Sequence, residues 1–334
     1  MRADAASSYL VADIGGTHAR FALAQADGTP GTPVVMQTCD FADFPQALSA
    51  FIDKHAKGPV AAAAICGAGP VSDGVITMTN CPWIIDRRQI AAACGIAEVE
   101  IINDFTAIAH ALPHLGLADL DRIGGGEADP AAPVGVLGAG TGLGVSGLIS
   151  KNETAIALSG EGGHVGLSPA SDRELEIFRH LLAERGRISA ETILSGPGIA
   201  TLYRTLAIID GAASRADERK TAALSAEHIT QRAAAGTDAR AIETLDLFSG
   251  WLGAVAGDLA LTLGAKGGIY LAGGIAGRLG PLFNKTLFRQ RFEAKGRFES
   301  YMAAIPCYLI TRDNPALIGL AALLRQSRDT AKSS

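Results

Sequence analysis

The sequence predicts an α/β protein built from two related domains, and three observations support that class. Short apolar runs alternate along the chain with longer segments of helical periodicity, which is the pattern of α/β folds. The chain has 334 residues, enough for two ordinary domains. A layout of apolar strand, Gly-Thr turn and apolar strand also occurs twice, around Gly15–Thr17 and around Gly138–Gly144, which indicates two structurally related halves.

The first predicted element is a hairpin rather than a strand that leads into a helix. An apolar run at Tyr9–Asp13 meets a glycine turn, and an alternating run at Arg20–Gln25 returns. Val34–Thr38 is expected to pair beside them. The rest of this half is predicted to contain helices over Phe44–His55 and Arg87–Cys94 and strands over Val60–Cys66 and Glu98–Ile102.

The second half is predicted to begin with the second hairpin, in which Val134–Leu137 enters the glycine run Gly138–Gly144 and Val145–Ile149 returns. The later elements are helices over Leu175–Glu184, Gly198–Ile209, Ala226–Ala235, Ala239–Gly264 and Pro315–Arg325, and strands over Gly268–Leu271 and Cys307–Thr311. We expect a boundary near Pro113–Gly116, with the last helix returning to the first domain. The expected domains are 1–114 with 311–334, and 115–310.

Composition and charge argue against several classes of protein. The formal net charge is −5, so there is no overall basic field to attract nucleic acid or anionic lipid. Met1–Ser8 lacks the basic start and apolar run of a signal peptide. The most apolar long stretch, Trp251–Ala265, is interrupted by Asp258 and falls short of a membrane span, so we expect a buried helix there.

The cysteines indicate a reduced, cytoplasmic protein without a zinc site. They are odd in number, scattered, and lack a C-x-x-C pair: Cys39, Cys66, Cys81, Cys94 and Cys307.

The turn after the first strand, Asp13-Ile14-Gly15-Gly16-Thr17, is a candidate phosphate site. Glycines remove side chains and let backbone N–H groups point at an anion, and the threonine adds a hydroxyl donor. Asp13 is placed to hold water on a magnesium ion. The alternative is an ordinary tight turn with a solvated carboxylate, and the motif matches neither the P-loop nor G-x-G-x-x-G.

The second glycine run strengthens the phosphate interpretation, because two similar turns are able to hold a triphosphate from both sides. Its central residues are Gly140, Thr141 and Gly142. A third glycine pair, Gly273 and Gly274, follows a predicted strand and suits either the close approach of a nucleoside or a simple packing turn.

Asn103 and Asp104 end an apolar strand and precede a helix. Ligands of α/β proteins bind beyond the carboxyl ends of strands, and a carboxylate beside an amide suits the hydroxyls of a sugar. The alternative is a helix N-cap, for which both residue types are favoured. The two roles are compatible, since a helix N-terminus holds a carboxylate ionised.

Residues of three further segments complete the candidate set. Gly162 and Gly163 exclude a regular helix and indicate a loop. Such a loop would bring Glu161 and His164 toward one point, and planar polar side chains of this kind bind sugars. A metal site is the poorer alternative, because no third ligand lies nearby at a regular spacing. Glu191 precedes a Gly-rich turn and is either a ligand or a surface residue of a helix. The stretch from Ser195 to Gly198, with Gly196 in it, is expected to start a helix whose N-terminus meets the nucleotide.

Together these motifs resemble the bacterial glucokinase family, in order and over nearly the whole chain from about Tyr9 to Arg325. The stretches that carry the resemblance are Asp13–Thr17, Ile102–Phe105, Gly140–Gly144, Gly160–His164, Ile193–Gly198, Leu271–Ile275, Lys295–Phe298 and Ile305–Pro306. Two departures stand out. His18 follows Thr17 where asparagine is more usual, and the Cys-rich zinc motif of the related sugar-kinase and repressor group is absent.

The resemblance implies a two-domain, actin-like ATPase (ribonuclease H-like) fold with an interdomain cleft that closes over its substrates. It implies transfer of a phosphoryl group from ATP with Mg²⁺ to the 6-hydroxyl of glucose, and commonly a homodimer. By position it implies sugar contacts at Asn103, Asp104, Glu161, His164 and Glu191, with Asp104 as the catalytic base. It implies phosphate loops at Asp13–Thr17 and Gly140–Gly142.

Two alternative functions remain open at this stage. A kinase for mannose, fructose or an amino sugar would use the same polar residues, which do not specify the epimer. A sugar sensor that regulates transcription would need a DNA-binding helix pair and a basic patch; only eight residues precede the first predicted strand.

Overall fold

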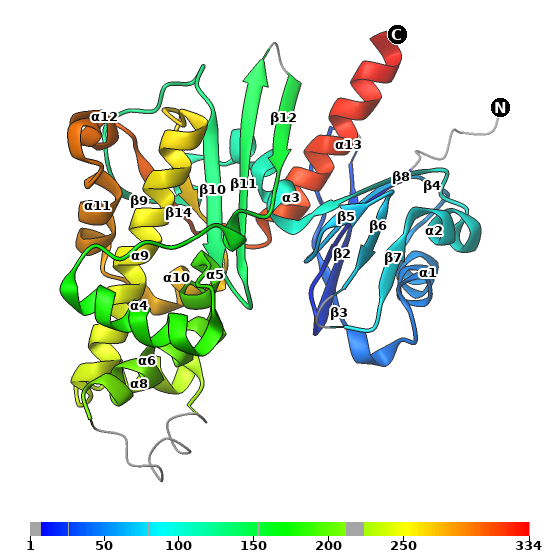
Figure 1. Ribbon diagram of the computed structural model, residues 1–334. Helices are drawn as coiled ribbons and strands as arrows, with labels where there is room; N and C mark the ends of the chain where they lie inside the picture. The colour runs from blue at the N-terminus through cyan, green and yellow to red at the C-terminus, as the bar shows by residue number, and fades with distance from the viewer. Residues whose placement is uncertain (1–7, 26, 79–80, 152–153, 212–223, 334) are drawn as a thin grey trace, which may run out of the picture. The chain divides into compact units, whose positions relative to one another are not determined.

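The computed structural model describes residues 8–25, 27–78, 81–151, 154–211 and 224–333 (Figure 1). Almost all of the N-terminal stretch Met1–Ser8, which was compared with a signal peptide, lies outside these residues. By its internal contacts the chain divides into two units. The first comprises Met1–Gly116, Lys151–Ser159 and Arg312–Ser334, and the second comprises Leu117–Ser150 and Gly160–Thr311.

The first unit is built on a five-stranded sheet in the order β3-β2-β1-β4-β8. The predicted hairpin is confirmed, with β1 (Ser8–Ile14) antiparallel to β2 (His18–Ala24). On the far side of the hairpin β3 (Val34–Gln37) pairs with β2, and β4 (Val60–Gly67) and β8 (Glu98–Asn103) continue the sheet in parallel.

Helices α1 (Phe44–His55) and α2 (Arg87–Cys94) begin and end as predicted, because each has a strong capping residue. The side chain of Asp43 accepts a hydrogen bond from Gln46 N, and that of Asp86 accepts one from Arg88 N. Phe21 stacks between Phe44 and Phe51 in the core of this unit. A small sheet of β5 (Val71–Ser72), β6 (Val75–Thr77) and β7 (Ile84–Asp86) was not predicted, since strands this short give no periodicity to read.

Two further helices belong to the first unit, α3 (Asp104–Ala111) and α13 (Pro315–Ser333). They pack closely, since a side chain at Gly319 of α13 would lie 1.8 Å from the carbonyl oxygen of Ala107 in α3. Helix α13 runs well beyond the predicted end at Arg325. The catalytic candidate Asp104 therefore stands at the start of a helix fixed by the C-terminal part of the chain.

The second sheet repeats the arrangement of the first in the order β12-β11-β10-β13-β14-β9. An antiparallel hairpin, β10 (Val134–Ala139) with β11 (Leu143–Lys151), is followed by the parallel strands β13 (Ile269–Leu271) and β14 (Cys307–Ile310). The edge strands β9 (Leu120–Gly124) and β12 (Thr154–Ser159) were not predicted. This shared strand order accounts for the repeated hairpin motif in the sequence.

The described helices of the second unit are α4 (Asp172–Arg185), α5 (Ala190–Ile193), α6 (Gly196–Ile209), α8 (Ala226–Ala234), α9 (Ala239–Leu263), α10 (Gly274–Leu279), α11 (Lys285–Glu293) and α12 (Glu299–Ala303). Four of them, α4, α6, α8 and α9, fall close to their predicted ranges, and α5, α10, α11 and α12 were not predicted. The backbones of α9 and α11 approach so closely that a methyl group at Gly253 would lie 2.1 Å from the carbonyl oxygen of Phe288.

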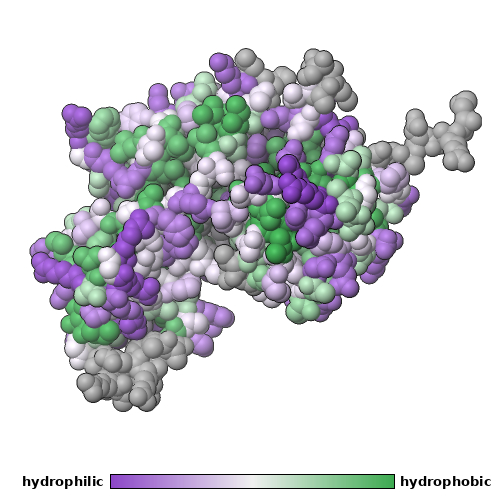
Figure 2. Space-filling model, turned by 45° about the vertical axis from the view of Figure 1, so that its right-hand side comes forward, coloured by the Kyte–Doolittle hydropathy of each residue, from purple (hydrophilic) through white to green (hydrophobic). Residues whose placement is uncertain are grey.

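The apolar stretch Trp251–Ala265 is a buried helix, as predicted, because nearly all of it lies in α9, where Trp251 is fully buried. The interrupting Asp258 forms an ion pair with Lys295 at 2.6 Å. Across the described parts of the chain, we find no helix with the length and apolar character to cross a bilayer. Figure 2 shows hydrophilic and hydrophobic residues interspersed over the visible face.

Candidate functional site

The first glycine turn, Gly15–Thr17, is short and is held by Thr38, the residue that follows β3. Gly15 N donates to His18 O at 2.9 Å, which closes the turn. Thr38 holds the turn with two hydrogen bonds, from its N to Thr17 O at 3.0 Å and from its Oγ1 to Gly16 O at 2.9 Å. His18, the departure from the family pattern, thus contributes its backbone carbonyl to the closure of the turn.

Asp13 lies at the end of β1 between side chains from both neighbouring strands. In the register of the sheet it faces Arg20 on β2 and Cys66 on β4. Cys66 Sγ donates to Asp13 Oδ1 at 3.6 Å, and Arg20 Nη1 lies 3.9 Å from Asp13 Oδ2. Loss of water on burial raises the pKa of Asp13, while Arg20 opposes the shift. No sequence motif marks Cys66 or Arg20 for this contact.

Asn103 is the N-cap of α3, as the alternative interpretation predicted. Its Oδ1 accepts from Phe105 N at 2.8 Å and from Thr106 N at 3.3 Å. Its Nδ2 donates to Gly69 O at 3.3 Å, so the amide is fixed at both ends. The two cap bonds use both lone pairs of the amide oxygen, so the group that Asn103 offers a ligand is the second N–H of its Nδ2.

Asp104, the first residue of α3, is a carboxyl group with a strongly perturbed pKa. Loss of water on burial, followed by the negative charge of Asp13, raises the pKa of Asp104 to about 6. The hydrogen bond from Phe105 N to Asp104 Oδ1, 2.9 Å long, opposes the shift. Desolvation outweighs the favourable helix end, so the pKa of Asp104 is raised rather than lowered, but the carboxyl group is still mostly ionised at neutral pH. A pKa near 6 suits a proton acceptor at neutral pH.

The second glycine turn is narrower than the sequence indicated. Gly138 pairs with Gly144 and Ala139 with Leu143 inside the hairpin ladder, so only Gly140–Gly142 form the turn. Gly140 N donates to Gly142 O at 2.8 Å.

The segment from Glu191 to Gly196 lies directly against this turn. Glu191, in the first turn of α5, accepts from Leu143 N through its Oε2 at 2.8 Å. Gly196 N, the first residue of α6, donates to Gly140 O at 2.9 Å. The prediction that a helix starts in this stretch is confirmed, with Ser195 as its N-cap.

The Glu161–His164 segment is a tight turn packed on β11. A methyl group at Gly163 would lie 2.2 Å from Leu143 O, and one at Gly162 would lie 2.7 Å from the side chain of Val145. The two glycines therefore allow the turn to approach the hairpin, while Glu161 and His164 stay exposed. Among the residues that the structure describes, no cluster of His, Cys, Asp and Glu is suitable for a metal ion.

The glycine pair after β13 approaches the same hairpin. Gly273 has φ of 80°, which a residue with a side chain rarely adopts. A methyl group there would lie 2.7 Å from Ala139 O, and one at Gly138 would lie 2.0 Å from Ala272 O. Gly274 begins α10. The site residues predicted in the second unit are thus all found in the β10–β11 hairpin, in segments that pack on it, or immediately after such a segment.

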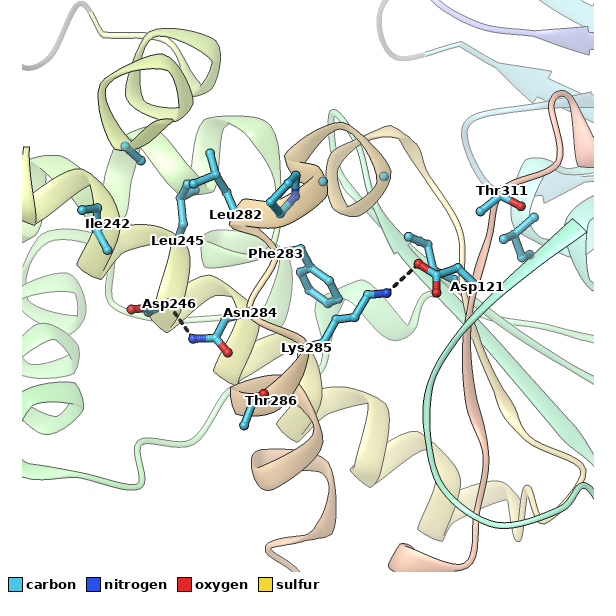
Figure 3. Close-up of a pocket in the computed structure, with 16 residues that line it drawn as sticks. Asp121, Ile242, Leu245, Asp246, Leu282, Phe283, Asn284, Lys285, Thr286 and Thr311 are labelled. Carbon is cyan, nitrogen blue, oxygen red and sulfur yellow. Dashed lines mark hydrogen bonds and ion pairs between the residues drawn. The ribbon is translucent and has the colours of Figure 1, made fainter. Parts of the chain in front are cut away.

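The second unit also contains a cavity of about 890 Å³ that the sequence did not reveal (Figure 3). One wall is apolar, with Leu245 of α9 and Phe283 (Figure 3). The rest of the lining includes the two polar pairs of Figure 3, Lys285 Nζ with Asp121 Oδ2 at 2.6 Å and Asn284 Nδ2 with Asp246 Oδ1 at 2.8 Å. The lining residues come from segments far apart in the chain and form no motif.

Comparison with known proteins supports the resemblance seen in the sequence. Residues 10–327 match the Glucokinase family. A glucokinase of Aromatoleum aromaticum is 44% identical over 319 residues, which are 94% of each chain, and one of Chromobacterium violaceum is 42% identical over 315 residues, 94% of this chain and 88% of that one.

Among solved structures, a glucokinase from an Antarctic psychrotroph superposes with a TM-score of 0.84 at 34% identity, and the match covers 95% of this chain and 98% of that one. The predicted two-domain actin-like ATPase fold is thereby confirmed. The match of the family over residues 10–327 and the identity above 40% lead to one conclusion: the chain belongs to the glucokinase family.

Proposed function

We propose that this chain transfers the terminal phosphoryl group of ATP to the 6-hydroxyl of D-glucose. Membership of the glucokinase family supports the reaction. The observation in the structure that carries it is Asp104, a carboxyl group at the end of β8 whose pKa is raised to about 6. A group of this kind is ionised at neutral pH and still basic enough to accept a proton from a sugar hydroxyl.

Asp104 acts as the general base in this proposal. The hydroxyl donates a hydrogen bond to the carboxylate, attacks the phosphorus in line with the leaving oxygen, and passes its proton to Asp104 as the new O–P bond forms. Asn103 orients the base from the neighbouring position, because its own side chain is fixed by the cap of α3 and by Gly69. General-base assistance is worth roughly 10²–10⁴-fold in rate.

The sugar is held by Asn103, Asp104, Glu161, His164 and Glu191. Carboxylates, an amide and an imidazole together supply donors and acceptors for several hydroxyls. Glu161 and His164 are exposed and available to a ligand, and the carboxylate of Glu191 keeps acceptor capacity besides its bond to Leu143 N.

The phosphates of ATP are held by the two glycine turns, through Gly15, Gly16 and Thr17 of the first and Gly140, Thr141 and Gly142 of the second. Backbone N–H groups of such turns bind anions without side-chain interference. Gly196, at the N-terminus of the 14-residue helix α6, lies beside the second turn and adds the positive end of a helix dipole.

The nucleoside extends from Gly273 and Gly274 along α10 into the cavity of the second unit. Gly277 and Gly280, within and just after α10, line that cavity, and its volume is sufficient for an adenosine group. The apolar wall at Leu245 and Phe283 suits a planar base, and Asn284 supplies a polar contact. Leu245→Trp is expected to fill the cavity and to raise KM for ATP without changing KM for glucose.

Magnesium is expected to bind mainly through ATP. The described residues offer no set of three protein ligands, which is a poor fit for a metal held by the protein alone. A single carboxylate such as Asp13 fits a hydrated Mg²⁺ that is bound chiefly by phosphate oxygens, because this ion commonly keeps several waters. A bound Mg²⁺ would neutralise phosphate charge in the reaction, and Asp13 would hold it through a water.

The test is an assay of ADP release by the purified chain over a panel of hexoses. We expect glucose to give the highest kcat/KM, since buried polar groups left unpaired by the wrong epimer lower its rate. A higher kcat/KM for mannose, fructose or an amino sugar would assign the alternative hexose kinase. Release of ADP at the same rate with and without every sugar would contradict both the glucose kinase and the alternative hexose kinase.

Two further properties complete the proposal. We expect a homodimer, on the resemblance to the family. We expect a cytoplasmic location, because all five cysteines carry free thiols, as reducing compartments maintain.

A further inference from the structure

The second glycine turn is held at both ends by one short segment of the chain. Gly196 N donates to Gly140 O where the chain enters the turn, and Glu191 Oε2 accepts from Leu143 N where the chain leaves it. The distances are 2.9 and 2.8 Å, both ordinary for strong hydrogen bonds. The position of the turn therefore depends on the segment from Glu191 to Gly196.

Gly142 is in direct contact with the same carboxylate. A methyl group at this position would lie 2.3 Å from Glu191 Oε2, far inside any real contact. Gly142 does not have a positive φ, so its backbone conformation would accept a side chain. The requirement for glycine is thus steric, and the group that imposes it is the Glu191 carboxylate.

The carboxylate is itself rigidly supported. Glu191 lies in α5, where Ser189 N donates to Thr192 Oγ1 at 3.1 Å in a capping box. Its carbonyl accepts from Ser195 Oγ at 2.9 Å, and Ser195 Oγ also accepts from Gly198 N at 3.0 Å to cap α6. A side chain supported in this way is able to fix the backbone that it contacts.

We propose that Glu191 is a positioning residue for the Gly140–Gly142 turn, so that nucleotide affinity depends on its carboxylate even when no sugar is bound. The inference rests on the proposed function, in which this turn holds phosphates and Glu191 contacts the sugar. Since one side chain then serves both ligands, sugar and nucleotide affinities are coupled, and the coupling is reciprocal.

The test is calorimetric titration of ADP into the full chain in the absence of sugar. Glu191→Ala removes the acceptor of Leu143 N, and we expect roughly a tenfold weaker Kd, in line with the loss of one charge-assisted hydrogen bond. Glu191→Gln keeps an acceptor oxygen and is expected to bind ADP nearly as well as the wild type. Glu127→Ala is the control, because it removes an exposed carboxylate of the same unit that pairs with Arg122, and its Kd should not change.

A double-mutant cycle with Gly142 isolates the contact. Gly142→Ala should weaken ADP binding in the wild-type chain, because the methyl group and the carboxylate cannot both occupy their positions. In the Glu191→Ala background the same change should have little effect, which makes the two losses non-additive. Additive losses would overturn the proposal, and so would a Glu191→Ala chain that binds ADP like the wild type.

The failure of this inference is distinguishable from that of the proposed function. A wild-type chain that binds no ADP and phosphorylates no hexose contradicts the function itself. A wild-type chain that does both, with unchanged ADP binding after Glu191→Ala, contradicts only the positioning role. Thermal denaturation of each variant establishes that it is folded, and Gly142→Ala tests the same contact if Glu191→Ala does not fold.

Discussion

Glu174 and Arg291 form a two-pronged ion pair that joins α4 to α11 inside the second unit. Arg291 Nη1 contacts Glu174 Oε1, and Arg291 Nη2 lies 3.2 Å from Glu174 Oε2. The Glu174 side chain is only 4% exposed and also accepts from Ala170 N at 2.7 Å. Its carboxylate is therefore fully engaged within the second unit.

Glu174→Ala is expected to lower the free energy of unfolding by about 3 kcal/mol, because it leaves the largely buried Arg291 without its partner. Urea denaturation measures the loss. The control is Glu127→Ala at the exposed Arg122–Glu127 pair, where about 0–1 kcal/mol is expected. Equal effects of the two substitutions would show that burial of the first pair has no energetic weight.

Asp104→Asn is expected to reduce kcat by roughly 10²–10⁴-fold, since an amide cannot accept the hydroxyl proton. The amide oxygen still accepts from Phe105 N, so the start of α3 is preserved. Steady-state kinetics with glucose and ATP measure the change. A variant with near-normal turnover would remove Asp104 from the role of base.

The pH dependence of turnover should report the same carboxyl group. Its pKa is about 6, raised by burial and by Asp13, and only the ionised form accepts a proton. We expect kcat/KM to be level above about pH 7 and to fall roughly tenfold per pH unit well below 6. A profile without a group near pH 6 would contradict the assignment.

Asp104→Asn should also make the protein more stable at pH 8. The folded pKa of Asp104 is raised above its unfolded value, so its favourable contribution is complete below about 4 and is lost as the pH rises through about 6. Removal of the buried charge is expected to gain about 3 kcal/mol at pH 8 and little at pH 4. Denaturant titrations at the two pH values decide between this outcome and a pH-independent change.

His110 and His114 should make the stability of the fold change with pH in the opposite direction to Asp104. Burial lowers the pKa of His110 from 6.5, and the nearby His114 adds to the effect; burial and Arg325 lower the pKa of His114 in the same way. Their folded forms resist protonation, so stability is complete above about pH 6.5 and is lost as the pH falls through their lowered pKa values. Replacement of both by glutamine should flatten the acid limb of the stability curve measured by thermal denaturation. A limb of unchanged steepness would assign it to other groups.

The sequence predicted the longer helices and both hairpins, because helical periodicity and glycine turns between apolar strands are local patterns. Helices α1 and α2 begin at the predicted residues, where the structure shows that Asp43 and Asp86 cap them. The short strands β5 to β7 contain two or three residues each and have no readable period.

The candidate side chains were predictable by type and spacing, but their energetics were not. The pKa of Asp104 depends on burial and on Asp13, which lies in β1, whereas Asp104 follows β8 of the same sheet. The contact between Gly142 and Glu191 joins segments far apart in the chain. Such effects arise from tertiary packing, so no local pattern in the sequence reveals them.

The discontinuity of the first unit has a consequence for synthesis on the ribosome. Its strands and α3 are made early, but α13, which packs on Ala107 through Gly319, is among the last segments to emerge. The second unit has all of its residues before Arg312. Because domains fold as their residues become available, the second unit is able to complete its core first. The first unit must wait, with the α13-facing side of α3 uncovered, until translation reaches the end of α13.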